Sequence, residues 1–573
     1  MNLKSMRCRD KNHKAPNEWA IGVLLALATA VFVFWQNAHL TVLWDLSYIL
    51  ENANRMALGQ VPYRDFPFPY APLTFLMQAA LIRLFGHAVW HHTVYAALVA
   101  AAGTVLTWRI VLRLLRASTL PRQMTALLLT LPLTVLGTGA IFPHPFYDAD
   151  CTVFVLLCLW LLLKLEDVEY PRALTVLCGV LLMVPLFIKQ NTGLAFVASA
   201  TVCAVWLGIR GQRRALLLLL GELVGLVAAL AVLHWTVLLH NYFHWTIAFA
   251  ASRRLPGMST MLGVYRDPSL LVPALLFAAG AALWAASRKL TAQQPAWIAA
   301  ALLSAPLLLA VAALFLQDND SDRAEALLRV WPVVLAAALV WSAVRALRRP
   351  AMENLLPLMV LGTVHGAFLS QQLWGSTYAL WPLFVLLAAA LLAWTSAARR
   401  HEQGLRPLLA LCALFCVALL GCGGYYALSH ERLQYVDLDG DTLQHSKLPA
   451  LRGLAMRGDY LPQFEELVDY TNREIPRDDA ILEIPGEDLF YYATGRVPRF
   501  PVILMDNTVN PYSAEQLLTL CGRRDVRWII VKKKLQLQEE PLAFREKLMM
   551  LVARDYEPVE SLDNYEIYKR RAE

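Results

Sequence analysis

Asp45 is the residue of this sequence with the clearest capacity for chemistry. It follows an apolar stretch, Trp19 to Leu40, that is long enough for a membrane helix of roughly 20 residues. Ionisable groups at membrane depth are costly and usually functional, and a carboxylate can accept the proton of a hydroxyl group that attacks another molecule. We therefore predict that Asp45 is a general base. The alternative is that Asp45 only caps the helix that follows, where the helix dipole favours an anion.

The segment after Asp45 is a predicted interfacial helix. Apolar residues repeat at helical spacing from Leu46 to Ala57, while Tyr48, Asn52 and Arg55 share the face of Asp45. After Gly59 follows a proline-stiffened aromatic stretch. We expect both segments to offer polar groups to a substrate, and the candidates are Tyr48, Asn52, Arg55, Arg64, Asp65 and Tyr70.

Two further clusters follow apolar stretches. His144, Asp148 and Asp150 lie in one short turn, and they could orient an acceptor hydroxyl or hold a divalent metal ion together with Asp45. The alternative is a solvated turn with an aspartate capping the next helix. Lys189 lies at another predicted outer boundary, where it could bind a substrate or simply extend its ammonium group into water.

A fourth cluster lies in the predicted outer loop 241–267. Arginine forks bind phosphate in bidentate geometry, which would explain basic residues on this side of the membrane. The substrate-binding candidates are Arg253, Arg254, Tyr265 and Arg266. Ion pairing with Asp267, or with the run Asp318, Asp320 and Asp322, is the competing interpretation.

The composition predicts a membrane scaffold for these clusters. The chain is 58% hydrophobic and only 17% charged, whereas soluble domains are roughly 25% charged. Apolar stretches indicate an all-α polytopic protein with about 13 membrane spans. They run over residues 19–43, 90–112, 124–142, 151–165, 173–188, 193–209, 215–239, 269–286, 296–316, 327–345, 354–371, 378–396 and 407–428.

Lysine and arginine predict the orientation, because they are enriched in cytoplasmic loops. Placing residues 1–18 in the cytoplasm puts most of them inside. Most lysines and arginines face the cytoplasm only if the apolar run Pro72 to Phe85 lies in the outer interface rather than spanning the membrane. We therefore predict a multi-pass protein of the inner (plasma) membrane, with a transmembrane catalytic domain at 19–428, a first outer loop at 44–89 and a soluble extracytoplasmic domain at 429–573.

The region after residue 428 is predicted to be a small α/β domain. Helical periodicity over 461–473 and 513–520 alternates with short strands at 480–484 and 527–531, and a third helix is expected near 542–552. Pro485, Gly486 and Glu487 indicate a turn. No phosphate loop, paired-cysteine ligands or nucleophile elbow occurs there, so we assign this domain no chemistry.

The motif from Gly59 to Leu73 carries a family resemblance. It reads Gly-x-x-Pro-Tyr-Arg-Asp-Phe-x-Phe-x-Tyr-x-Pro-Leu, and it follows an acid after the first span. This pattern resembles the GT-C membrane glycosyltransferases. Within that fold it is similar to the family of the lipid A aminoarabinose transferase, the protein mannosyltransferases and the rhizobial lipopolysaccharide glycosyltransferases. One departure is that several relatives carry a lysine before the paired prolines, where this chain has Tyr70-Ala71-Pro72.

The resemblance implies transfer of a sugar from a polyprenyl phosphate to a lipid, glycan or protein acceptor of the cell envelope at the outer face. Asp45 matches the base, and Asp148 or Asp150 matches the acid of the second loop. Lys189 and the later arginines would bind the donor phosphate. No cofactor is required beyond a divalent ion if one takes part, and we expect membrane lipids but no nucleic acid as partners.

Three other functions are compatible with many spans. A transporter should show related halves or interrupted helices with polar groups at the midplane, whereas these candidates lie at the outer interface. An O-antigen ligase or polymerase is expected to carry its large soluble region between spans, and here that region is terminal. A scaffold would not need so many spans.

Overall fold

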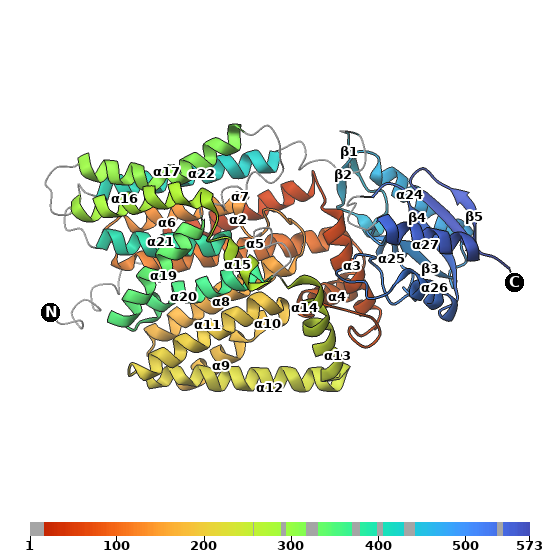
Figure 1. Ribbon diagram of the computed structural model, residues 1–573, viewed down its shortest axis with the longest axis horizontal. Helices are drawn as coiled ribbons and strands as arrows, with labels where there is room; N and C mark the ends of the chain where they lie inside the picture. The colour runs from red at the N-terminus through yellow and green to blue at the C-terminus, as the bar shows by residue number, and fades with distance from the viewer. Residues whose placement is uncertain are drawn as a thin grey trace.

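The computed structural model consists of a helical bundle and a smaller α/β domain at one end of it (Figure 1). It describes residues 17–255, 257–287, 294–316, 331–369, 379–397, 405–428, 440, 442–535 and 542–572. The predicted cytoplasmic residues 1–16 and the acids Asp318, Asp320 and Asp322 lie outside these ranges.

Within the described residues, each predicted apolar stretch overlaps a helix or a broken pair of helices. The bundle helices are α2 (Asn17–Asn37), α5 (Val89–Leu114), α6 (Arg122–Thr130), α7 (Leu133–Leu136), α8 (Tyr147–Asp167), α9 (Arg172–Leu182), α10 (Val184–Ile188), α11 (Gln190–Ile209), α12 (Leu217–Val237), α16 (Leu271–Ser287), α17 (Gln294–Leu316), α19 (Trp331–Arg348), α20 (Met352–Phe368), α21 (Trp381–Ala397) and α22 (Arg406–Leu428). The break between α6 and α7 includes Pro132, and the break between α9 and α10 lies at Met183, two residues before Pro185. Proline lacks the N–H that a continuous helix needs.

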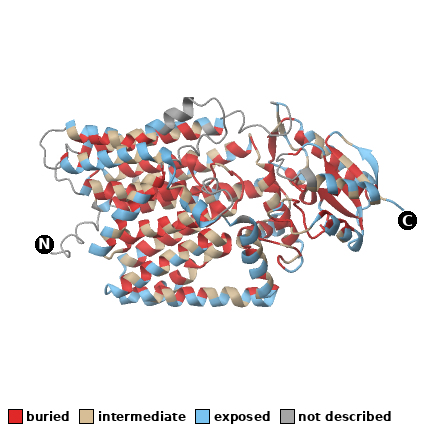
Figure 2. Ribbon diagram, viewed as in Figure 1, coloured by how far each residue is buried: buried red, intermediate tan, exposed pale blue. Residues whose placement is uncertain are grey.

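The chain is a multi-pass membrane protein by the length and composition of these helices. Within the described residues seven helices are long and apolar enough to cross a membrane, and four apolar helices are shorter. The number 13 and the orientation of the termini stay predictions. Apolar side chains cover much of the bundle's outer surface, and exposed residues are spread along the whole of α12 (Figure 2).

Two short helices lie between the bundle and the α/β domain (Figure 1). They are α3 (Leu43–Ala57) and α4 (Leu73–Phe85). With 13 residues α4 is about 20 Å long, too short for a hydrocarbon core of roughly 30 Å. The run Pro72 to Phe85 therefore fits the predicted interfacial position.

The terminal domain is built on a four-stranded sheet in the order β3-β4-β6-β5. The first two strands are parallel and the other pairs are antiparallel. Its elements are β1 (Leu443–His445), β2 (Ala455–Arg457), α24 (Tyr460–Glu474), β3 (Ala480–Ile484), α25 (Phe490–Thr494), α26 (Ala514–Arg523), β4 (Val526–Lys532), α27 (Leu542–Asp555), β5 (Tyr556–Ser561) and β6 (Tyr565–Arg570).

The sequence predicted the three long helices and the two parallel strands of this domain but not its antiparallel strands. Strand β3 has the predicted bounds, and Pro485 and Gly486 begin the turn after it. The hairpin of β5 and β6 was not predicted, because β5 is largely exposed and its sequence Glu-Pro-Val-Glu-Ser lacks the apolar alternation typical of a strand.

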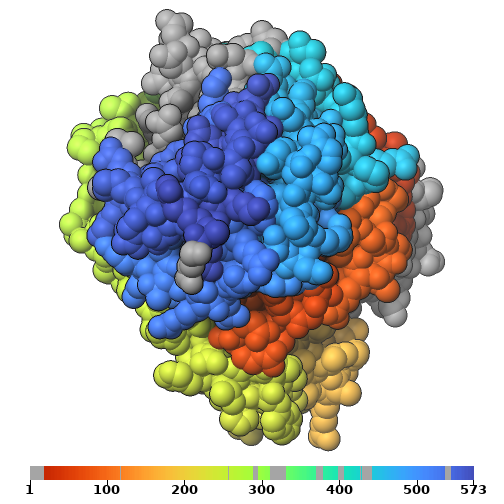
Figure 3. Space-filling model, turned by 90° about the vertical axis from the view of Figure 1, so that its right-hand side faces the viewer, coloured from red at the N-terminus to blue at the C-terminus, as the bar shows by residue number. Residues whose placement is uncertain are grey.

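One apolar core joins the terminal domain to α3. Leu46, Ile49 and Leu50 of α3 belong to the same cluster of buried side chains as Phe464 of α24 and Ile530 of β4. The space-filling view shows the terminal domain directly beside the first outer loop (Figure 3). We expected α3 to lie open at the interface, but this domain covers it.

Candidate active site

Asp45 lies in the first turn of α3 and is half-buried. The helix begins at Leu43, and the amide of Leu46 already donates to the carbonyl of Val42 at 3.1 Å. Trp44, the residue before Asp45, packs against Leu504 of the terminal domain. The structure thus places Asp45 where the first outer loop meets the terminal domain.

A row of tyrosine rings leads away from Asp45. Tyr48, one turn later on α3, lies with its ring centroid 5.0 Å from that of Tyr70. The ring of Tyr70 is in turn 5.3 Å from that of Tyr147, which begins α8. The row therefore joins α3, the proline-rich stretch and α8. Tyr147 was not among our predicted site residues, although it lies beside Asp148 in sequence.

Lys189 and Asp148 form a buried ion pair at the far end of this row. The Lys189 ammonium also lies over the Tyr147 ring, 5.6 Å from its centroid. The backbone of Lys189 is extended between α10 and α11, and this break lets its side chain point back toward α8. Because Lys189 is only 8% exposed, the alternative that it extends into water is not what the structure shows.

Gln190 holds the proline-rich stretch beside this ion pair. Its side-chain amide donates to the carbonyl of Pro69 at 3.0 Å, and its oxygen accepts from the amide of Ala71 at 3.2 Å. The adjacency to Lys189 was the only sequence signal for this role. The resulting assembly contains Asp45, Tyr48, Tyr70, Tyr147, Asp148 and Lys189.

Asp150 forms its hydrogen bonds with other residues than those of this assembly. It is 1% exposed, and its two oxygens accept hydrogen bonds from Thr74 Oγ1 at 2.6 Å and from the Tyr95 hydroxyl at 2.9 Å. These bonds tie α8 to α4 and α5. The geometry therefore favours a structural role for Asp150, whereas Asp148 is the carboxylate that pairs with Lys189.

This role of Asp150 leads to a stability prediction. Tyr95→Phe should lower the free energy of unfolding by about 1.5 to 3 kcal/mol, because it removes a hydrogen bond to a buried carboxylate. Tyr170→Phe is the matched control, since the buried Tyr170 hydroxyl makes no hydrogen bond within the described residues. Thermal unfolding of both variants in detergent measures the difference; equal midpoints would remove this role from Asp150.

The predicted metal ligands do not converge. His144 is buried, and its Nδ1 lies 3.0 Å from the carbonyl of Pro145. Asp148 and Asp150 have the partners described above. Throughout the described ranges, no group of three or more histidine, cysteine, aspartate or glutamate side chains is placed to hold a metal ion. The residues predicted as metal ligands therefore do not fit a metal site.

The described candidates of loop 241–267 make contacts of their own. Arg253 is exposed and lies over the Phe249 ring at 5.6 Å, and Arg266 is exposed. Tyr265 bonds His365 Nε2 through its hydroxyl at 2.6 Å. Arg254 ends a short helix, α14 (Ala250–Arg254), and its side chain lies outside the described part of the structure. For Arg253, Arg254 and Arg266 phosphate binding stays a prediction.

Four predicted substrate-binding residues of the first outer loop have protein partners. Arg64 and Asp65 form an exposed ion pair with Nε and Oδ1 2.9 Å apart. Asn52 donates to the carbonyl of Tyr48 at 2.7 Å, and Arg55 donates to the carbonyl of Pro501 at 2.9 Å. Asn52 and Arg55 are buried. The shared face on α3 was predicted, but its far end contacts the terminal domain.

Comparison with solved structures identifies the fold. The archaeal oligosaccharyltransferase AglB from Archaeoglobus fulgidus, in complex with an inhibitory peptide and a dolichol-phosphate, superposes with a TM-score of 0.50 at 10% identity, covering 97% of this chain and 74% of that one. The chain has the GT-C fold. ArnT from Cupriavidus metallidurans bound to undecaprenyl phosphate gives a TM-score of 0.45 at 13% identity, covering 97% of this chain and 99% of that chain.

A second Archaeoglobus fulgidus oligosaccharyltransferase structure, a complex with Zn and sulfate, covers 89% of this chain and 68% of that chain, with a TM-score of 0.46 at 12% identity. No protein-family model and no curated protein sequence matches this chain. The GT-C fold is thus established by structure alone, and the individual reaction has to be inferred from the site.

Proposed function

We propose that this protein is a membrane glycosyltransferase that moves a sugar from a polyprenyl phosphate to a cell-envelope acceptor on the outer face. The observation that carries the proposal is the assembly that runs from Asp45 through three tyrosine rings to the ion pair of Lys189 and Asp148. It combines a carboxylate for proton removal with a cation for a leaving phosphate. The dolichol-phosphate of the structurally similar oligosaccharyltransferase supports this class of donor.

The reaction is a direct displacement. The Asp45 carboxylate takes the proton of the acceptor hydroxyl while the hydroxyl oxygen bonds to the anomeric carbon of the donor sugar. The bond between that carbon and the phosphate oxygen breaks, and the leaving polyprenyl phosphate keeps the electron pair. Lys189 stabilises this charge, since an ammonium has three donors and Asp148 occupies only part of them. One displacement inverts the anomeric centre.

The tyrosine rings position the donor sugar between the two charged ends. Aromatic rings offer large apolar contact areas at low conformational cost, and ordered positioning of reactants lowers a barrier substantially. We place the terminal domain and the site outside the cytoplasm, on the basis of the arginine-rich loops that are predicted to face inward.

The proposal is tested with purified protein in proteoliposomes. Polyprenyl phosphates that carry radiolabelled hexoses or pentoses are supplied with an extract of envelope lipids and glycans, and mass spectrometry identifies the glycosylated product. We expect release of polyprenyl phosphate and an inverted product linkage with one donor class. If no donor yields product or free polyprenyl phosphate in the presence of the extract, the proposal is wrong.

A further inference from the structure

Glu51 lies in the middle of α3, six positions beyond Asp45, and it points into the terminal domain. It is 1% exposed. Its Oε1 accepts a hydrogen bond from the backbone amide of Tyr492 at 2.9 Å, and the amide of Tyr491 also donates to the carboxyl group. Both tyrosines belong to α25, which packs against α3. One side chain of the helix that carries Asp45 therefore binds the backbone of another domain.

Arg55, one turn after Glu51, makes a second connection to the terminal domain. Its Nη1 donates to the carbonyl of Pro501 at 2.9 Å, and its guanidinium lies over the Phe66 ring at 4.1 Å. Gln60 donates to the carbonyl of Pro498 at 2.8 Å. These bonds attach α3 and the residues after it to the segment 498–501.

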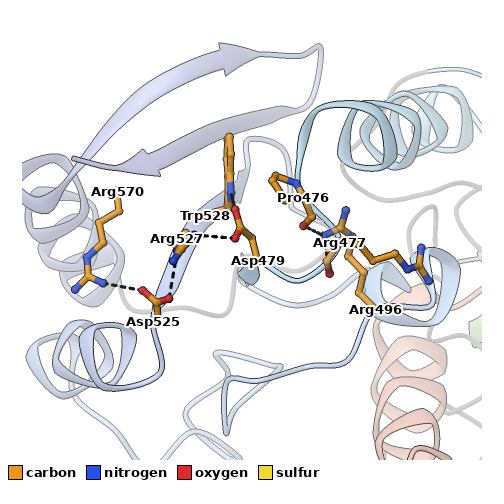
Figure 4. Close-up of polar contacts among 8 residues, drawn as sticks. All are labelled: Pro476, Arg477, Asp479, Arg496, Asp525, Arg527, Trp528 and Arg570. Carbon is orange, nitrogen blue, oxygen red and sulfur yellow. Dashed lines mark hydrogen bonds and ion pairs between the residues drawn. The ribbon is translucent and has the colours of Figure 1, made fainter. Parts of the chain in front are cut away.

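The segment 498–501 is itself held by the body of the terminal domain. Arg496, just before it, donates to the carbonyl of Pro476 at 2.8 Å and to that of Ile475 at 2.6 Å; Figure 4 shows Arg496 reaching toward Pro476 and Arg477. Further along, Leu504 and Val509 pack on Trp44. The terminal domain therefore contacts α3 at its middle, near its end, and at the residue directly before Asp45.

We propose that Glu51 is a positioning residue for the transfer reaction, because it fixes α3 against the terminal domain and thereby holds Asp45 at the acceptor. This inference rests on the proposed function. Glu51 itself touches neither reactant in this scheme; it acts through the helix. Small displacements of reacting groups cost up to about 100-fold in rate, so a loosened α3 should lower kcat.

The charges around Glu51 make this contact sensitive to pH. The pKa of the Glu51 carboxyl is raised from 4.5 to about 8, mainly by burial and slightly by Asp488, while the amides of α25 and the charge of Arg55 act in the opposite direction. Beyond them the carboxyl group of Glu483 is buried as well, and its pKa is also raised by burial.

The other groups near this contact are paired with one another. Lys532 Nζ lies 2.5 Å from Glu487 Oε1 and 2.9 Å from Asp488 Oδ1. Asp488 also accepts from the hydroxyls of Tyr460 and Tyr565. On the bundle side, the Tyr492 hydroxyl lies 3.1 Å from His92 Nε2, and the His87 ring stands edge-on to Tyr492 at 4.8 Å.

The direction of the pH effect follows from proton binding. Between pH 4.5 and about 8 the docked Glu51 holds a proton that an exposed glutamate has lost. The docked state therefore binds more protons, and docking weakens as pH rises through this interval. We expect kcat of the wild-type protein to decline as pH rises toward about 8 and to level off above it.

The test compares Glu51→Gln, Glu51→Ala and the control Glu557→Gln, which changes an exposed glutamate on β5. Glu51→Gln keeps an oxygen that accepts an amide hydrogen bond but cannot ionise. We expect near-wild-type kcat at pH 7 and no decline toward pH 9. Glu51→Ala should lose about 10 to 100-fold in kcat at pH 7 with donor and acceptor KM nearly unchanged, and the control should match the wild type.

Hydrogen exchange supplies a readout that does not depend on transfer. The amides of Tyr491 and Tyr492, and those of residues 43–50, should exchange faster in Glu51→Ala but not in Glu557→Gln. The inference is overturned if Glu51→Gln keeps the wild-type pH profile, or if Glu51→Ala keeps the wild-type kcat or exchange rates. A wild-type protein that transfers no sugar would contradict the proposed function, whereas the exchange result would still test the docking.

Discussion

Asp45→Asn is expected to abolish sugar transfer while the protein stays folded and inserted. An amide has nearly the volume of a carboxylate but cannot take a proton from the acceptor hydroxyl. General-base catalysis contributes about 10² to 10⁴-fold, so kcat should fall by at least two orders of magnitude. The measurement is the rate of polyprenyl phosphate release in proteoliposomes with labelled donor and excess acceptor.

Two controls separate catalysis from folding in this experiment. Asp478→Asn changes an exposed aspartate of the terminal domain and should leave the rate unchanged. Donor affinity of Asp45→Asn should also stay near the wild-type value, because the carboxylate acts on the acceptor. Full activity of Asp45→Asn would exclude the catalytic role and leave the capping interpretation.

Lys189→Met is expected to lower both stability and activity. It leaves the buried Asp148 carboxylate without its cation, and breaking a buried ion pair costs about 3 to 5 kcal/mol. The substitution also removes the positive charge that we propose stabilises the leaving phosphate. Thermal unfolding measures the first effect, and donor-dependent kcat measures the second.

The double variant Lys189→Met with Asp148→Asn distinguishes these two effects. The double variant has no unpaired buried charge, so its free energy of unfolding should be close to that of the wild type. Replacing both partners of a buried ion pair is far less destabilising than removing one. Its activity should stay low. If both sugar transfer and stability recover, Lys189 is needed only for folding. Another cation would then have to stabilise the leaving phosphate.

Local patterns predicted the positions of the candidate residues well. The apolar periodicity after Asp45 predicted α3, and the break around Lys189 predicted a polar group at a helix boundary. These patterns involve only residues that are close in sequence. The bounds of β3 could be predicted for the same reason. The GT-C resemblance drawn from the motif after Gly59 agrees with the fold.

The partners of those residues could not be predicted in the same way. Asp148 and Asp150 lie two positions apart, yet one bonds Lys189 and the other bonds Thr74 and Tyr95. That difference depends on which helices pack against α8, and helical spacing carries no such information. The same holds for Glu51, whose partner Tyr492 lies 441 residues further along the chain.

The shared core of α3 and the terminal domain has a consequence for biogenesis. The helix with Asp45 is complete by Ala57, but Phe464, Ile530 and Ile567, which complete its apolar surroundings, are synthesised about 400 or more residues later. An unfinished polypeptide therefore leaves Leu46, Ile49 and Leu50 without that cover. With this arrangement, α3 is fully packed only after the α/β domain has been synthesised and has folded.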